Sequence, residues 1–197
     1  MLFKQTFNKP FLGKAGNYLF FGLLLLLLFN PSAKAWLLRQ AMAVGLFKAE
    51  IKKEAPATNL PAGATAFSFR DESGATRSTA DLKGKVMFIN FWATWCPPCI
   101  AEMPSLNDLY NQFREDENFV FLFINEDEDA AKAKTFLQSK GYAIPLVTRA
   151  GNLSAEIFSG TLPTTVVLDK DGRVAFRHEC LAQYNNPAFI NQLKALL

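Results

Sequence analysis

The chain has 197 residues, of which half are hydrophobic and 19 are phenylalanine, and its formal net charge is +3. This length can supply one domain with a sizeable core in addition to a leader segment. Because the positive charge is small, arises partly in the leader and forms no basic stripe in the domain, the composition argues against a nucleic-acid partner.

The first 47 residues predict export of the chain. Lysines precede an apolar run over residues 18–29, and Ala33-Lys34-Ala35 follows it, as in a secretory signal that is cleaved after Ala35. The run is shorter than the ~20 residues of a spanning helix, although Trp36-Leu37-Leu38 and the apolar positions of 41–47 would suit an uncleaved anchor at a bilayer surface. We therefore expect residues 1–47 to be a signal sequence or a membrane anchor with a juxtamembrane segment. We favour a tethered domain on the extracytoplasmic (periplasmic) face of the cell envelope over secretion after cleavage near Ala35.

Residues 48–63 predict a linker, because they are first charged and then rich in Ala, Pro, Thr and Gly. The domain is expected to occupy residues 64–197. It opens with a hairpin, in which a strand at 66–70 turns at 71–74 and returns toward 78–82.

The rest of the domain alternates between strands and helices. Residues 86–92 are apolar and β-branched or aromatic, which predicts a buried strand. The helix that follows carries apolar residues at helical spacing, namely Leu106, Leu109, Tyr110 and Phe113. Next we expect a strand at 119–124, a helix at 129–140 ended by Gly141, a strand at 144–147, a short helical piece at 153–158, a hairpin of 166–169 and 173–177, and a last helix from Asn186-Pro187. The acidic run 126–129 suits the N-terminal dipole of the helix at 129–140, with substrate steering as the alternative.

Trp95-Cys96-Pro97-Pro98-Cys99 lies at the junction between the buried strand and its helix. Two cysteines at this spacing and place are typical of a reversible disulfide. The prolines occupy first-turn positions, where a missing amide donor costs little. The helix dipole and the unpaired amides favour a thiolate at Cys96, whose pKa then falls well below the usual ~8.5. Cys99 lies one turn further into the helix and is expected to be more covered, as a resolving cysteine would be.

Residues 88–99, followed by Glu102-Met103-Pro104, resemble the TlpA/ResA-like branch of the thioredoxin-fold thiol-disulfide oxidoreductases. The resemblance covers roughly residues 64–197. It implies an α/β thioredoxin fold, in which a central mixed β-sheet is flanked by helices, with an N-terminal hairpin and an internal αβ insertion at 129–147. It also implies that Leu162-Pro163 is the loop with a cis-proline beside the disulfide.

The same resemblance implies an activity and its partners. The enzyme would reduce disulfides in client proteins outside the cytoplasm, with no cofactor or metal, and cytochrome c precursors, a metallochaperone and misoxidised envelope proteins are all compatible clients. Because that compartment is oxidising, the electrons would have to come from a membrane thiol donor. Asn90 stands where thioredoxin itself carries a buried aspartate, and Glu102 stands where this branch places a replacement acid.

The residues support a role for Glu102 independently, because Cys99 and Glu102 are three apart and share a helix face. A partly buried carboxylate with a raised pKa would accept the proton of Cys99, whereas the alternative is a solvated helix glutamate. We predict that Cys96 is the nucleophile, Cys99 the resolving cysteine and Glu102 the proton shuttle. The predicted apolar docking surface for clients consists of Trp95, Pro97, Leu162 and Pro163.

Other interpretations of the cysteines remain. A purely structural disulfide would close a very small loop and add little stability. Cys96, Cys99, His178 and Cys180 form an acceptable zinc ligand set, but the last two follow an expected edge strand, away from the first pair. A Sco-like copper module spaces its cysteines differently, and the Thr-x-x-Cys pattern of peroxiredoxins is absent around Cys96. A disulfide-donating oxidase or isomerase is the alternative within the same chemistry, and Cys180 is best explained as an ordinary loop thiol.

Overall fold

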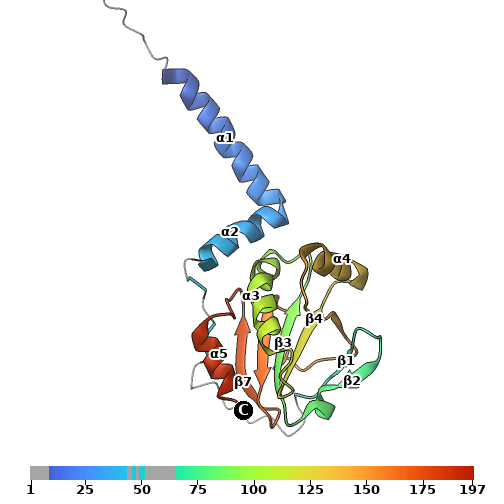
Figure 1. The fold of residues 1–197 in the computed structure, drawn as a ribbon. Coiled ribbons are helices and arrows are strands. Elements are labelled where there is room, and N and C mark those ends of the chain that lie inside the picture. Colours follow the sequence, from blue (N-terminus) through green and yellow to red (C-terminus); the bar gives the residue numbers. More distant parts are fainter. Residues whose placement is uncertain (1–8, 44–45, 48, 52–64) are drawn as a thin grey trace, which may run out of the picture.

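The computed structural model describes residues 9–43, 46–47, 49–51 and 65–197 (Figure 1). Residues 1–8 and most of the predicted linker, residues 52–64, lie outside these ranges. Within the linker, Ala49 is buried and donates its N–H to the carbonyl of Gln183 at 3.1 Å. The side chain of Gln192 bonds to both backbone groups of Ile51, at 2.6 and 3.0 Å. This short segment therefore lies against the domain.

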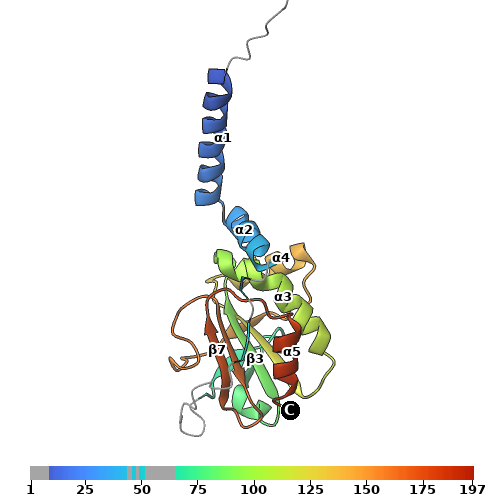
Figure 2. The same ribbon diagram turned by 90° about the vertical axis from the view of Figure 1, so that its left-hand side faces the viewer.

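Two helices precede the domain, α1 (Lys9–Phe29) and α2 (Pro31–Ala43). Figures 1 and 2 show α1 pointing away from the sheet and α2 lying across one end of the domain. Ala35 and Met42 of α2 are buried in a small apolar cluster with Ile100 and Ala101 of α3 (Pro97–Phe113). The second helix of the predicted leader thus contacts the helix that carries the cysteines.

Neither N-terminal helix is by itself long and apolar enough to cross a membrane, within the ranges that the structure describes. Gly16–Leu27 and Pro31–Met42 pass that test only when they are taken together, and they are bent by 95° relative to each other.

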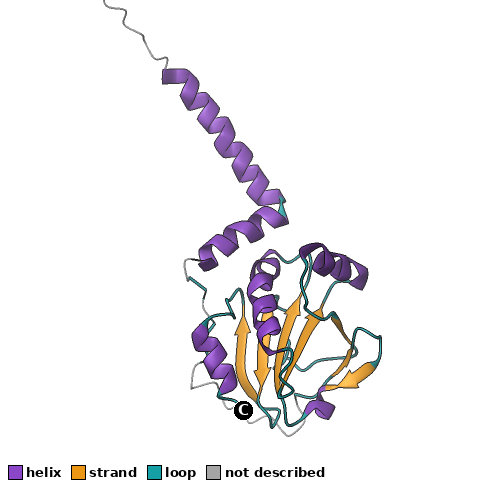
Figure 3. Cartoon of the chain, in the orientation of Figure 1, coloured by secondary structure: helices purple, strands orange, loops and turns teal. Residues whose placement is uncertain are grey.

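A seven-stranded sheet with the order β2-β1-β5-β4-β3-β6-β7 forms the centre of the domain (Figure 3). β3 pairs in parallel with β4 and antiparallel with β6, so the sheet is mixed as predicted. Every residue of β3 is buried, and this strand separates the two apolar cores. The strands are β1 (Ser68–Arg70), β2 (Thr76–Ser78), β3 (Val86–Trp92), β4 (Phe119–Asn125), β5 (Val147–Arg149), β6 (Thr164–Leu168) and β7 (Val174–Glu179).

Alternate residues of β3 point into different cores, as expected for a strand that is buried on both faces. Phe88 belongs to the core under α3, α4 (Ala130–Lys140) and α5 (Pro187–Lys194). Ile89 and Phe91 belong to the core on the other face, where the ring of Phe158 stacks on that of Phe91 at 4.4 Å. The sheet therefore places Asn90 on the same face as Phe88, toward α3.

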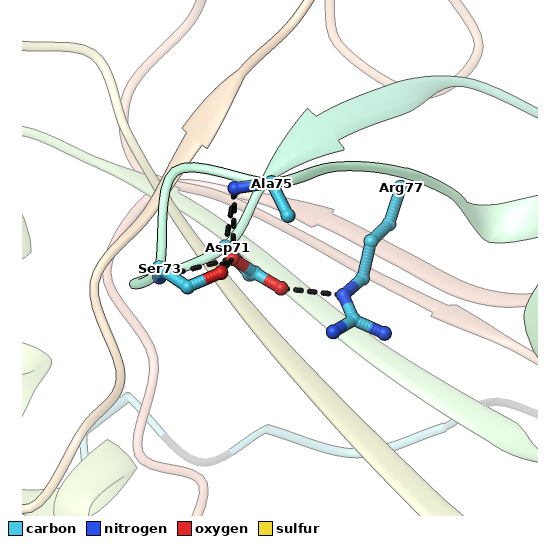
Figure 4. A network of polar contacts seen from close by, with 4 residues as sticks. All are labelled: Asp71, Ser73, Ala75 and Arg77. Atoms are coloured by element: carbon cyan, nitrogen blue, oxygen red, sulfur yellow. Dashed lines mark hydrogen bonds and ion pairs between the residues drawn. The ribbon is translucent and has the colours of Figure 1, made fainter.

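The opening hairpin is confirmed, and its turn is built around Asp71 (Figure 4). The carboxylate accepts the hydroxyl of Ser73 at 2.5 Å and the backbone N–H groups of Ser73 and Ala75 at 3.0 and 3.1 Å, and it pairs with the Arg77 guanidinium. The Ser73 hydroxyl and then Arg77 hold the pKa of this surface carboxyl down to about 2. After β2 the chain forms the 3-10 helix η1 (Thr79–Leu82) instead of continuing the hairpin.

Helix ends agree well with the sequence-based predictions. Asp129 caps the N-terminus of α4 by accepting the N–H of Ala131 at 2.9 Å, and Gly141 ends this helix in the left-handed conformation with φ 66°. Asn186 caps α5 by accepting the N–H of Phe189 at 2.9 Å. Such side-chain acceptors and a terminal glycine satisfy the groups that a helix leaves unpaired.

Two local predictions are wrong. The helix expected at 153–158 is a single turn, in which Ile157 and Phe158 donate to the Ser154 carbonyl at 3.0 Å. Ile157 is buried in the second core and Phe158 packs against it, so tertiary packing shapes this segment. The strand expected at 144–147 begins at Val147, because Pro145 has no N–H to donate to a strand ladder.

Candidate active site

The cysteine pair lies where β3 ends and α3 begins, and it forms a disulfide with Cα atoms 5.3 Å apart. Cys96 is the N-cap of α3, and its Sγ accepts the N–H of Cys99 at 3.3 Å. The same amide can hydrogen-bond a thiolate once the disulfide opens, which favours ionisation of Cys96. Cys96 retains 4% of its surface exposed and Cys99 none, so Cys99 is the more covered of the two, as predicted.

The α3 helix continues from the cysteines through Pro104 and places Glu102 in the protein interior, with no exposed surface. Oε1 of Glu102 accepts Nδ2 of Asn90 at 2.9 Å, and Oε2 accepts the N–H of Ala182 at 3.3 Å. Burial raises the pKa of Glu102 to about 8, and the two donors offset this rise only in part. The carboxyl is therefore mostly protonated at neutral pH, and the alternative of a solvated helix glutamate is wrong.

Asn90 joins Glu102 to a third element of the fold. Its Nδ2 also donates to Oγ1 of Thr165 at 2.9 Å, so one amide links β3, α3 and β6. The sequence indicated Asn90 only as a departure from thioredoxin, and it did not indicate Thr165 at all. The available signal was one polar residue within an otherwise apolar buried strand, because such a residue needs a hydrogen-bonding partner.

The four residues predicted to form the docking surface differ in exposure. Trp95 is 62% exposed, whereas Pro97 and Leu162 are half-buried and Pro163 is buried. The peptide bond between Leu162 and Pro163 is cis, which agrees with the loop implied by the family resemblance. The role of these residues in client binding stays a prediction.

The segment after β7 lies closer to the candidate site than we expected from the sequence. The N–H of Cys180 donates to the carbonyl of Pro163 at 3.0 Å, two residues before the Ala182 amide that bonds Glu102. The Cys180 thiol itself is exposed and unpaired. Among the described residues, no three His, Cys, Asp or Glu side chains come together as they would around a metal ion.

Known proteins are similar to this chain in sequence and in fold. A family model described as Redoxin matches residues 55–181. The chain belongs to the Redoxin family. It is 34% identical over 159 residues to the thiol-disulfide oxidoreductase ResA of Bacillus thuringiensis, an alignment that spans 80% of this chain and 86% of that one. Within Redoxin, the chain is thus a ResA-like thiol-disulfide oxidoreductase, as its sequence predicted.

Solved structures agree on the fold. A thiol-disulfide oxidoreductase from Bacteroides fragilis superposes with a TM-score of 0.54 at 27% identity, over 68% of this chain and 98% of the other. StoA from Bacillus subtilis superposes with a TM-score of 0.53 at 24% identity, over 69% and 98%. The predicted α/β thioredoxin fold is confirmed.

Proposed function

We propose that this oxidoreductase works outside the cytoplasm as a reductant of disulfides in client proteins, with Cys96 as the attacking cysteine and Cys99 as the resolving one. The observation that carries the proposal is the buried Glu102, one helical turn after Cys99 and protonated at neutral pH. A dithiol must lose and regain protons in every cycle, and a buried carboxyl of this kind can exchange them.

The reaction proceeds in two thiol-disulfide exchanges. The Cys96 thiolate attacks one sulfur of the client disulfide, so that a bond between Cys96 and the client forms while the other client sulfur leaves as a thiolate and takes a proton. Cys99 then loses its proton and attacks Sγ of Cys96, which restores the Cys96–Cys99 disulfide and releases the second client thiol. Two electrons pass to the client, and the enzyme pair is oxidised.

Glu102 suits the second exchange. The pKa of the Glu102 carboxyl, about 8, is close to the ~8.5 of an ordinary thiol, so the ionised fraction of Glu102 can accept the Cys99 proton in a step that is nearly balanced in free energy. Glu102→Gln should slow the release of client and remove the matching ionisation from the pH profile of disulfide reduction. Glu128→Gln, at an exposed glutamate, is the matched control and should leave the profile unchanged.

The proposed location rests on the leader and on α2. Trp36 and Leu37 are 59% and 50% exposed on α2, while Ala35 and Met42 of the same helix are buried against α3. An outward apolar face of this kind suits a helix that lies at a bilayer surface. Because an extracytoplasmic compartment is oxidising, a membrane thiol donor would have to return electrons to the pair.

Alkaline extraction of cell membranes tests the anchor. We expect the intact chain to stay with the membrane fraction, with its N-terminal segment present. A soluble mature chain that begins at Trp36 would instead establish secretion after cleavage at Ala35.

The reduction potential of the Cys96–Cys99 pair tests the direction of electron flow. A value near that of thioredoxin, about −270 mV, is expected for a reductant, whereas about −120 mV would identify a disulfide-donating oxidase. Stoichiometric metal retained under reducing conditions would identify a metal-binding module instead.

A Cys99→Ser variant identifies the clients, because the mixed disulfide with Cys96 can no longer be resolved. We expect clients linked through Cys96, with cytochrome c precursors as the first proteins to look for. Cys180→Ser is the control and should leave the trapped set unchanged. Adducts that form only at Cys180 would contradict the assignment of the nucleophile.

A further inference from the structure

The loop that precedes Cys96 is held by an acidic side chain from the segment that follows the neighbouring strand. Asp127 follows β4, which pairs in parallel with β3, so both strands end at the same edge of the sheet. Its two carboxylate oxygens accept the N–H of Thr94 at 3.2 and 3.1 Å, and Oδ1 also accepts the Thr94 hydroxyl at 2.9 Å. Thr94 stands two residues before Cys96, and the loop reaches Asp127 through this residue.

Asp127 is itself fixed in place. Nδ2 of Asn125, the buried last residue of β4, donates to Oδ2 of Asp127 at 2.8 Å. The N–H of Asp127 returns a bond to Oδ1 of Asn125 at 3.2 Å. Among the described residues, the hydrogen-bond partners of this carboxylate are amide and hydroxyl groups and include no cation, so its negative charge is not neutralised by an ion pair.

The acidic run 126–129 therefore does not act as a unit. Glu126 pairs with Arg149 at 3.3 Å, Asp129 caps α4 and Glu128 is exposed. The expected explanation, that the run opens a helix, holds for Asp129 alone. The Asp127 side chain instead accepts hydrogen bonds from Thr94, in the loop before the cysteine pair.

We propose that Asp127 is a positioning residue that fixes the Thr94–Cys96 loop and whose charge keeps the cysteine pair a reductant. The proposal rests on the proposed function, in which Cys96 is the attacking thiolate. Reduction of the disulfide adds two electrons and two protons, and the Cys96 thiol that results ionises easily at a helix N-terminus. The disulfide carries no such charge, so a nearby carboxylate disfavours the reduced form alone.

The expected size of this effect follows from the geometry. Two residues span at most ~7 Å of extended chain, and the bond to Thr94 and the Cys96 side chain add about as much again, so the carboxylate lies within ~14 Å of the Cys96 sulfur. At that distance, in a partly buried setting, one unit charge changes an equilibrium constant by about tenfold. For a two-electron couple, a tenfold change corresponds to about 30 mV.

Asp127→Asn in the full-length chain tests the charge, and Asp129→Asn in the same acidic run is the matched control. Each protein is equilibrated with glutathione buffers at low salt, and the oxidised fraction is measured by alkylation and mass spectrometry. Asp127→Asn should shift the equilibrium about tenfold toward the dithiol, whereas Asp129→Asn should stay close to the wild type. In 1 M salt the Asp127→Asn shift should become smaller without disappearing, because partly buried charges are screened less than exposed ones, whereas loss of a purely structural contact would give a shift that does not depend on salt.

Thr94→Val tests the positioning separately, because it removes the hydroxyl bond and leaves the charge. We expect an unchanged potential and a several-fold lower kcat/KM toward a protein disulfide. If Asp127→Asn does not fold, Asp127→Ser keeps an acceptor for Thr94 and should give the same shift in potential.

Equal potentials for the Asp127 and Asp129 variants, or a shift that ignores salt, would overturn the proposal. Its failure is distinguishable from failure of the proposed function. If Cys96→Ser still reduces clients, the proposed function is wrong whatever the potentials are. If Cys96 is required but Asp127→Asn behaves as the wild type, then the proposal for Asp127 alone is wrong.

Discussion

Two carboxyl groups of this domain both accept several hydrogen bonds, but their pKa values are shifted in opposite directions. Asp71, in the hairpin turn of Figure 4, has its pKa lowered to about 2, whereas Glu102, on the buried face of the cysteine helix, has its pKa raised to about 8. Asp71 has a guanidinium among its partners and faces solvent, while Glu102 has only amide donors and no exposed surface. The comparison teaches that neutral donors do not keep a carboxyl ionised once burial has removed water.

The largest expected effect is on the pH dependence of stability. A folded-state pKa of about 8 against 4.5 in the unfolded chain means that stability is fully present below pH 4.5 and is lost as pH rises to about 8, by about 5 kcal/mol. In the oxidised protein, where the pair does not titrate, Glu102→Gln should abolish this decline. Urea unfolding at a series of pH values measures it, with Glu128→Gln as the control. A wild-type unfolding free energy that stays constant over this pH range would contradict the raised pKa of Glu102 and with it the contrast to Asp71.

A smaller effect is expected from the donor to Glu102. Asn90→Ala leaves Oε1 of Glu102 without its side-chain donor and should cost about 1–3 kcal/mol in unfolding free energy. Because that donor lowers the pKa of Glu102, the decline in stability should extend to higher pH than in the wild type. Thr165→Val removes the bond between Asn90 and Thr165 but keeps both donors to Glu102, and it should leave the position of the decline unchanged. An Asn90→Ala curve that ends at the wild-type pH would show that burial alone sets the pKa.

The smallest effect is expected at the hairpin turn. A pKa lowered to about 2 from 3.8 gives stability that is present above pH 3.8 and is lost as pH falls toward 2. Asp71→Asn should therefore flatten the acid limb of the stability curve, weakly, because exposed pairs are screened by solvent and salt. Acid unfolding at low and high salt measures this, against Asp81→Asn as a second exposed aspartate near the hairpin. A wild-type acid limb that does not respond to salt would contradict the proposed contribution of Arg77 to the lowered pKa of Asp71.

Local sequence patterns were sufficient to predict the part of the site whose residues are close together in the sequence. The apolar run at 86–92, the cysteine spacing and the first-turn prolines predicted β3, the start of α3 and the relative burial of the cysteines, and all three are observed. Helical spacing also placed Glu102 on the same face as Cys99. It could not predict what covers that face, because Ala182, which bonds Glu102, lies 80 residues away in sequence.

The acidic run 126–129 illustrates the same limit. A helix start was a sufficient local explanation for all four residues, and it is correct for Asp129. The bond from Thr94 to Asp127 depends on the register of two strands, in which Trp92 lies opposite Asn125. Strand register is set by long-range packing, so a single run of residues does not reveal it.

One donor to Glu102 is the main-chain N–H of Ala182. Replacing side chains in an alanine scan would leave this position untouched, because the residue is already alanine and its contribution does not depend on a side chain. Ala182 is also buried in the core under α3, so a larger side chain there would disturb the packing and would not isolate the contribution of the N–H. Proline is the substitution that would remove the donor, and a proline scan is the form of mutagenesis suited to this main-chain contact with Glu102.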